Sequence, residues 1–88
     1  MIERSQEGAV TVLQLQHKKA NALDVELLGA LDAEIAAAER AGQALVITGS
    51  GSIFSAGVDL FRLLAGGDAY LDEFLPALDR LLLRLFTY

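Results

Sequence analysis

The sequence has no cysteine, no tryptophan, one proline and one histidine among its 88 residues. Without cysteine the chain can form neither a disulfide framework nor a thiolate metal site, and a cytoplasmic location is expected. The single histidine, His17, argues against a metal site. Basic residues are also scarce: 7 Lys and Arg against 12 Asp and Glu give a net charge of −5. This balance argues against a nucleic acid as the main partner.

Long apolar runs are missing as well. No run reaches the roughly 18 residues of a membrane-spanning helix, and the first residues, MIERSQEG, lack the pattern of a signal peptide. We therefore expect a soluble chain with no membrane partner. Even so, 53 % of the residues are apolar, and the mean hydropathy is +0.41. So short a chain covers apolar surface poorly, which predicts a compact core, burial in an oligomer, or one piece of a longer protein.

The N-terminal part of the chain predicts a β-hairpin. Residues 2–16 read as two strands with a turn at Glu7 and Gly8, because the second run, AVTVLQLQ, is rich in β-branched and aliphatic residues. Its alternation slips between Val12 and Leu13. Either a bulge or a strand covered on both faces would explain the slip.

Helical periodicity extends over residues 23–41, with Asp24 as the N-cap and Gly42 as a residue that can adopt a positive φ and end the helix. Its apolar stripe consists of Leu27, Leu31, Ile35 and Ala38. The unbroken run ALVIT, residues 44–48, then predicts a parallel strand buried on both faces. Strand, helix and strand in this order form a βαβ unit.

The C-terminal part predicts two helices. A short one spans residues 59–65 and stops at Gly66 and Gly67, and a longer one follows, which Pro76 is expected to kink or split. The apolar stripe of the longer helix comprises Leu71, Phe74, Leu75, Leu78, Leu82 and Leu85. The acidic residues of this longer helix are expected to form a solvated face. Elsewhere, His17 is expected to be a surface histidine, and the sequence indicates no partner for Tyr70.

The loop TGSGSIFSAGVDL, residues 48–60, follows the carboxyl end of the predicted parallel strand, where ligands bind in open α/β sheets. It is not a Walker loop, because Gly57 is followed by Val58 instead of lysine, and the dinucleotide fingerprint fails at Phe54. A third mechanism fits better: an N–H group just before a helix, such as that of Val58, can stabilise an oxyanion. The alternative is a plain turn whose glycines serve only its geometry.

Two segments, KANALDVELLGALDAEI and ALVITGSGSIFSAGVDL, resemble the N-terminal third of the crotonase, or enoyl-CoA hydratase/isomerase, superfamily over roughly residues 9–65. The specific parts are Asn-Ala-Leu at the helix entry and Phe-Ser-Ala-Gly-Val-Asp-Leu after the strand. The resemblance implies an α/β fold with a spiral of ββα turns. Residues 1–88 would then be the N-terminal part of a single crotonase-like domain: a β-hairpin, a βαβ unit, then helices.

The resemblance also implies a function, the hydration or double-bond isomerisation of an enoyl-CoA thioester. The backbone amide of Val58 would be the first oxyanion donor and would stabilise an enolate-like intermediate. The CoA slot would be lined by Lys19, Ala20, Ala22, Ala56, Gly57, Asp59 and Leu60. Arg62 is the basic residue nearest to the position, here Phe61, from which many members approach the CoA phosphates. Asp59 would cap the short helix instead of taking part in chemistry.

The same resemblance implies a homotrimer or a dimer of trimers, with no cofactor beyond the CoA of the substrate and no metal. In the family, the second oxyanion donor and the acid/base carboxylates lie further along than these 88 residues. Two other functions therefore stay open: a non-catalytic CoA-binding module and an oligomerisation module of the same fold.

Overall fold

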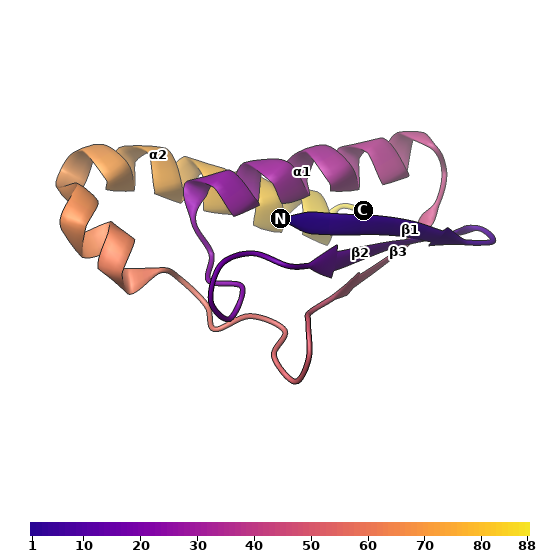
Figure 1. Ribbon diagram of the computed structural model, residues 1–88. Helices are drawn as coiled ribbons and strands as arrows, with labels where there is room; N and C mark the ends of the chain where they lie inside the picture. Colours follow the sequence, from indigo (N-terminus) through magenta and orange to yellow (C-terminus); the bar gives the residue numbers. More distant parts are fainter.

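The computed structural model describes residues 1–88 and contains five elements. They are the strands β1 (Ile2–Glu7), β2 (Val10–Leu15) and β3 (Ala44–Thr48) and the helices α1 (Val25–Arg40) and α2 (Leu60–Phe86). The strands form one sheet in the order β1-β2-β3, and both helices lie on the same side of it (Figure 1). The expected order of hairpin, βαβ unit and helices is confirmed.

The hairpin has an uninterrupted register. Strands β1 and β2 pair antiparallel from Ile2 opposite Leu15 to Glu7 opposite Val10, and Gly8 makes the turn with φ +62°. Of the two explanations left open by the sequence, a bulge is therefore excluded. One face of β2 is buried against the helices and its other face is half-buried, so partial cover of both faces explains the slipped alternation.

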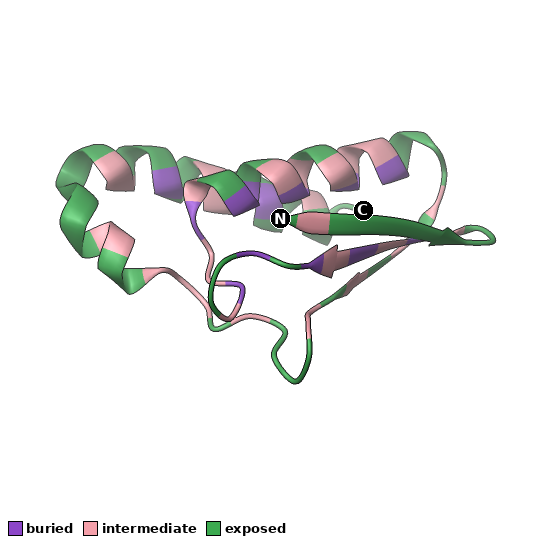
Figure 2. Ribbon diagram, in the orientation of Figure 1, coloured by how far each residue is buried: buried purple, intermediate pink, exposed green.

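Strand β3 pairs parallel to β2, but the prediction that both of its faces are buried is wrong. Leu45 and Ile47 pack against the core, whereas Val46 on the opposite face is 46 % exposed. The reason is its place at the edge of the sheet, with both helices on one side only (Figure 2). The apolar run predicted the strand correctly and its surroundings incorrectly.

Helix α1 begins and ends as predicted. The Asp24 side chain, at the N-cap, accepts a hydrogen bond from the Leu27 N–H at 2.8 Å. After the helix, Gly42 adopts φ +69° and its N–H donates to the Glu39 carbonyl at 3.0 Å. The buried face of α1 consists of Leu27, Leu28, Leu31, Ile35 and Ala38. These side chains meet Leu13 and Leu15 of β2 and Phe74 and Leu81 of α2, which completes the core.

Helix α2 is broken at Gly67, whose φ of 61° and ψ of −152° are not helical. The predicted stop at this position is therefore confirmed, and the break separates residues 60–66 from residues 68–86. The sequence predicts that Pro76 kinks or splits the longer part; Pro76 does not split it, because Gly67 is the one position in α2 with non-helical φ and ψ. Pro76 and Asp72 are exposed, so the carbonyl left without a helical donor faces water.

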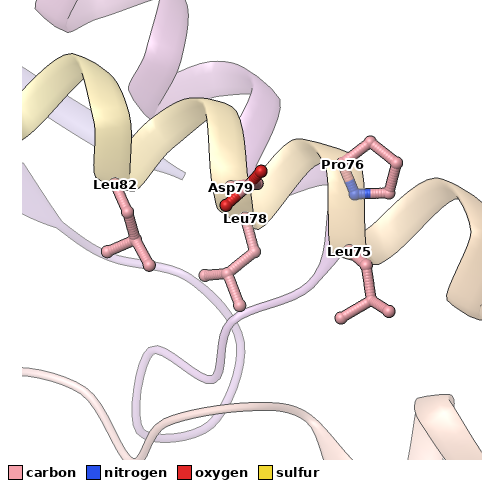
Figure 3. A pocket seen from close by; sticks show the side chains of 5 residues that line it. All are labelled: Leu75, Pro76, Leu78, Asp79 and Leu82. Carbon is pink, nitrogen blue, oxygen red and sulfur yellow. The ribbon is translucent and has the colours of Figure 1, made fainter.

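The apolar face of α2 is rotated from the predicted stripe. Phe74 and Leu81 are buried, whereas Leu75 is 52 % and Leu82 is 54 % exposed. These two leucines flank a shallow groove of about 420 Å³, into which their side chains project (Figure 3). The groove is lined by Leu75, Pro76, Leu78, Asp79 and Leu82. The helix is apolar on two faces and α1 covers only one of them. None of the helices is long and apolar enough to cross a membrane.

Replacing Leu28 by alanine tests the core. The side chain is 0 % exposed, so Leu28→Ala should lower the free energy of unfolding by about 2–5 kcal/mol through lost burial and the cavity it leaves. Leu64→Ala is the matched control, since Leu64 is also helical but 82 % exposed, and its effect should stay within about 0.5 kcal/mol. Urea denaturation followed by circular dichroism measures both. Equal losses for the two variants would contradict the described core.

Candidate functional site

Two loops, residues 16–24 and residues 49–59, lie side by side below the helices (Figure 1). Their backbones join in a parallel bridge between Leu23 and Val58. The Leu23 N–H donates to the Gly57 carbonyl at 2.7 Å, and the Asp59 N–H donates to the Leu23 carbonyl at 2.9 Å. The Ala56 N–H donates to the Ala20 carbonyl at 2.9 Å. These bonds connect two of the segments singled out by the sequence motifs.

Asn21 links the two loops through its side chain, a role that the sequence did not reveal. Its side-chain oxygen accepts from the His17 N–H at 2.7 Å, and its side-chain NH₂ donates to the Phe54 carbonyl at 3.0 Å. Ser55 adds a third connection, because its hydroxyl donates to the Asn21 carbonyl at 2.8 Å. Asn21 is 4 % exposed, so the contacts satisfy a buried amide.

The first loop has an unusual backbone. Lys18, Ala20 and Asn21 adopt φ of 45°, 59° and 51°, the left-handed region that side chains disfavour. Each such residue costs on the order of 1–2 kcal/mol. The hydrogen bonds to the second loop offset this cost, so the conformation of one loop depends on the presence of the other.

Two glycines shape the second loop for different reasons. Gly57 has φ +89°, which favours glycine. Gly49 is held by a close approach: a Cβ there would lie 2.1 Å from the Ile53 carbonyl oxygen. The loop thus folds back tightly after β3 and turns again just before Val58.

The Val58 N–H has no hydrogen-bond partner within the protein. In the bridge, Leu23 bonds to the carbonyl before Val58 and to the N–H after it, so the N–H of Val58 itself points to the opposite side. Asp59 then caps α2 by accepting from the Arg62 N–H at 3.1 Å. A half-buried backbone donor therefore lies free just before a helix.

A cavity of about 590 Å³ lies at this point. It brings together seven of the nine site residues predicted from the sequence: Lys19, Ala20, Ala22, Ala56, Val58, Asp59 and Leu60. Lys18 and Phe61 complete its lining, whereas Gly57 and Arg62 do not belong to it. Residues of both loops and the start of α2 border this cavity, which we call the slot.

Arg62 is directed toward α1. Its guanidinium forms a two-pronged ion pair with Glu26, with one of the two contacts at 2.9 Å, and lies 4.8 Å from the centre of the Tyr70 ring. The pair with Glu26 raises the pKa of Arg62 above its usual range and lowers the pKa of Glu26. A contact between Arg62 and CoA phosphates stays a prediction, and it would require this pair to open.

His17 is not a surface histidine, contrary to the sequence prediction. It is 8 % exposed, and its Nε2 lies 2.7 Å from one carboxylate oxygen of Asp24. The Lys18 Nζ lies 3.0 Å from the same oxygen. Asp24 is fully buried, and burial alone would raise its pKa; hydrogen bonds from His17, the Leu27 N–H and Lys18 outweigh burial and hold the pKa below its ordinary value.

Tyr70 also has partners that the sequence did not reveal. Its hydroxyl oxygen accepts from the Val25 N–H at 3.1 Å, and its ring stacks on Phe74 with centroids 5.9 Å apart. The hydrogen bond joins α2 to the first turn of α1, whereas the stacking lies within α2. No group of three or more histidine or acidic side chains lies close enough together to hold a metal ion.

Comparison with known proteins identifies what the chain is similar to. The family model described as enoyl-CoA hydratase/isomerase matches residues 5–88. An enoyl-CoA hydratase from Bacillus halodurans has 26 % identity and a TM-score of 0.88, covering 98 % of this chain and 38 % of its own. An enoyl-CoA isomerase from Mycobacterium tuberculosis has 33 % identity and a TM-score of 0.85, and the match covers 99 % of this chain and 38 % of that protein's chain.

A human mitochondrial Δ3-Δ2-enoyl-CoA isomerase has 26 % identity and a TM-score of 0.87, covering 97 % of this chain and 35 % of its own. A sequence search of curated proteins finds no match. The chain thus spans little more than a third of each of these three structures. The predicted resemblance and the predicted fold class, the N-terminal part of a crotonase fold, are confirmed.

Asp24→Asn tests the buried carboxylate. Because the folded pKa of Asp24 lies below its unfolded value of about 3.9, the charge stabilises the fold above that pH, and the stabilisation is lost as pH falls through the folded pKa. At pH 7 the variant should lose about 1–3 kcal/mol of unfolding free energy, and the gap to the wild type should narrow below about pH 4.

Asp72→Asn is the matched control, since Asp72 is exposed on α2. Its unfolding free energy should follow that of the wild type at every pH. Urea unfolding between pH 3 and pH 7 measures all three proteins. A gap for Asp24→Asn that stays constant over this range would contradict the assigned role of the charge.

Proposed function

The chain belongs to the enoyl-CoA hydratase/isomerase family, and from this premise we propose that it binds acyl-CoA thioesters in the slot, with the Val58 N–H donating to the thioester carbonyl. The observation that carries the proposal is the unpartnered Val58 N–H at the wall of the slot. Backbone donors fixed in advance stabilise charge that develops in the reaction, because they need no reorganisation at that moment.

The chemistry that fits is hydration or double-bond isomerisation of an enoyl-CoA. Both reactions build negative charge on the thioester oxygen as an enolate forms. One well-placed donor is worth about 2.7–4 kcal/mol of the barrier. Val58 is held for this role by the bridge to Leu23, which fixes the peptide planes on either side of it.

The lining of the slot suits the rest of a CoA thioester. Its volume of about 590 Å³ lies within the roughly 300–1,000 Å³ of ordinary ligand sites. Ala20, Ala22 and Ala56 present small side chains, so the backbone is accessible to a ligand. Lys18 and Lys19, both exposed, offer positive charge to phosphate groups.

A specific observation favours a second candidate, a CoA-binding module without turnover. Asp59 is the one carboxylate that lines the slot, and its side chain is engaged as the cap of α2. The 88 residues therefore offer no free carboxylate there for general acid/base work. Loss of the ultraviolet absorbance of a conjugated enoyl-CoA would favour the enzyme, and binding without that loss would favour the module.

Assembly as a homotrimer or a dimer of trimers is also part of the proposal. Exposed apolar side chains on α2, such as Phe61 at 89 % and Leu82 at 54 %, support it, because surfaces of this kind are usually covered by more protein. Multi-angle light scattering measures the assembly. A monomer at micromolar concentration would contradict this assembly.

A cytoplasmic location stays a prediction.

Val58→Pro tests the proposed donor, because proline removes the N–H while Val58→Ala keeps it. Infrared spectroscopy of a bound acyl-CoA labelled with ¹³C at the thioester carbonyl measures the contact. In the wild type and in Val58→Ala, the carbonyl stretch should fall to a lower wavenumber on binding, since a donated hydrogen bond weakens the C=O bond. In Val58→Pro this fall should be absent.

Binding of CoA without an acyl group shows whether the slot of Val58→Pro remains intact, since that ligand has no thioester carbonyl. Its dissociation constant should stay within about threefold of the wild type, the size of a change near 0.6 kcal/mol. An undiminished carbonyl shift in Val58→Pro would refute the role given to this amide.

A further inference from the structure

One carboxylate connects the slot to the start of α1. One oxygen of Asp24 accepts from the Leu27 N–H at 2.8 Å and so caps the helix. The other oxygen contacts the His17 Nε2 at 2.7 Å and the Lys18 Nζ at 3.0 Å. The Asp24 side chain is 0 % exposed and the His17 side chain is 9 % exposed, whereas Lys18 reaches into solvent with 52 % exposure.

We propose that His17 and Asp24 are a positioning pair for the slot, and that they couple the binding of an anionic ligand to the uptake of a proton by His17. The inference rests on the proposed function, because it takes the anionic groups of the ligand to enter the slot. It assigns a role to a contact that the binding of the thioester carbonyl does not use.

Lys18 is the exposed member of this arrangement, with 52 % of its side chain accessible to solvent. It lines the slot and also pairs with Asp24, so a phosphate in the slot competes with Asp24 for the same ammonium group. When Lys18 turns to the ligand, a fully buried carboxylate loses one of its two side-chain donors. A buried charge that loses a partner is costly.

His17 can supply the missing positive charge. A neutral imidazole gives Asp24 one hydrogen bond, whereas the protonated ring gives the same bond and a full charge. The low pKa of Asp24 agrees with this, since it keeps the carboxylate ionised throughout the range in which histidine titrates. Ligand binding should therefore favour protonation of His17.

The other charged groups near the pair do not replace Lys18. The Arg62 Nη1 lies 3.9 Å from the same Asp24 oxygen, but its guanidinium is held by Glu26 and stacked over Tyr70. Moving it to Asp24 would break that ion pair. The groups that face His17 and Asp24 are thus Lys18 from the loop, Glu26 from α1, and Arg62 and Tyr70 from α2.

Holding Asp24 in place also holds the wall of the slot. His17 is the first residue of the strained turn, and its N–H binds the Asn21 side chain at 2.7 Å. Its ring contacts Asp24, so side-chain contacts hold both ends of the turn, His17 and Asn21, in place. A change in the charge of His17 should therefore reach the backbone amides of this turn and of Leu27.

Isothermal titration with CoA as the probe, between pH 5.5 and pH 8.5, tests the linkage in the wild type and in His17→Gln, which keeps a donor but cannot gain a proton. The ratio of the dissociation constants, variant over wild type, cancels the titration of the CoA phosphates. It should grow about three- to tenfold from pH 8 to pH 5.5, equivalent to about 0.7–1.4 kcal/mol of binding free energy.

Lys18→Gln and Lys19→Gln form a matched pair of controls. Each removes one positive charge from the lining of the slot, but only Lys18 contacts Asp24. In the Lys18→Gln background the ratio should stay flat with pH, and in the Lys19→Gln background it should keep its rise although CoA binds more weakly. A flat ratio in the wild-type background, or an equal rise in both lysine backgrounds, would overturn the linkage.

A measurement without ligand separates this inference from the proposed function. In the ¹⁵N-labelled protein, a change in the charge of His17 with pH should shift the amide resonances of Lys19, Asn21 and Leu27, and in His17→Gln these shifts should be absent. Equal behaviour of the two proteins overturns the positioning pair, whether or not CoA binds. If neither protein binds CoA at any pH, the proposed function and the linkage both fail, and the amide titration alone decides the positioning role.

Discussion

The parallel bridge between Leu23 and Val58 is the contact on which the other parts of the site depend. Each bridging residue is followed at once by an aspartate that caps a helix, Asp24 for α1 and Asp59 for α2. One pair of backbone hydrogen bonds therefore sets where both helices begin. The same pair leaves the Val58 N–H pointing away from Leu23, where no other group of the protein accepts it. Fold and candidate chemistry come from one arrangement.

Contacts between the same two loops also explain how the chain tolerates three nearby residues with unfavourable backbone geometry. Lys18, Ala20 and Asn21 have positive φ values, and the bonds made by the Asn21 side chain and by Ser55 hold them there. The small side chains of Ala20 and Ala22 leave the backbone of this segment accessible from the slot. The cost of the turn is thus offset by contacts that simultaneously form one wall of the slot.

The sequence predicted features that depend on local rules. The capping role of Asp24, the stop at Gly66 and Gly67, and the free N–H before α2 follow from neighbours within a few positions. It did not predict features that depend on tertiary packing, that is, on which elements cover a given face. One face of β3 is exposed because both helices lie on the other side of the sheet. The buried face of α2 differs from the predicted stripe because only α1 and the sheet cover this helix. The Asp24 partner of the His17 ring and the Val25 partner of the Tyr70 hydroxyl lie seven and 45 residues away along the chain, and no local pattern in the sequence indicates either contact.

The central claim is that the Val58 amide donates to a thioester carbonyl, and the ¹H chemical shift of that amide tests it most directly. The ¹⁵N-labelled protein is titrated with an acyl-CoA and, separately, with CoA that lacks an acyl group. The account predicts a downfield shift of the Val58 amide proton with the thioester and little change with CoA alone, because only the thioester carries the acceptor. An unmoved Val58 resonance at saturating acyl-CoA, or equal shifts with both ligands, would contradict it.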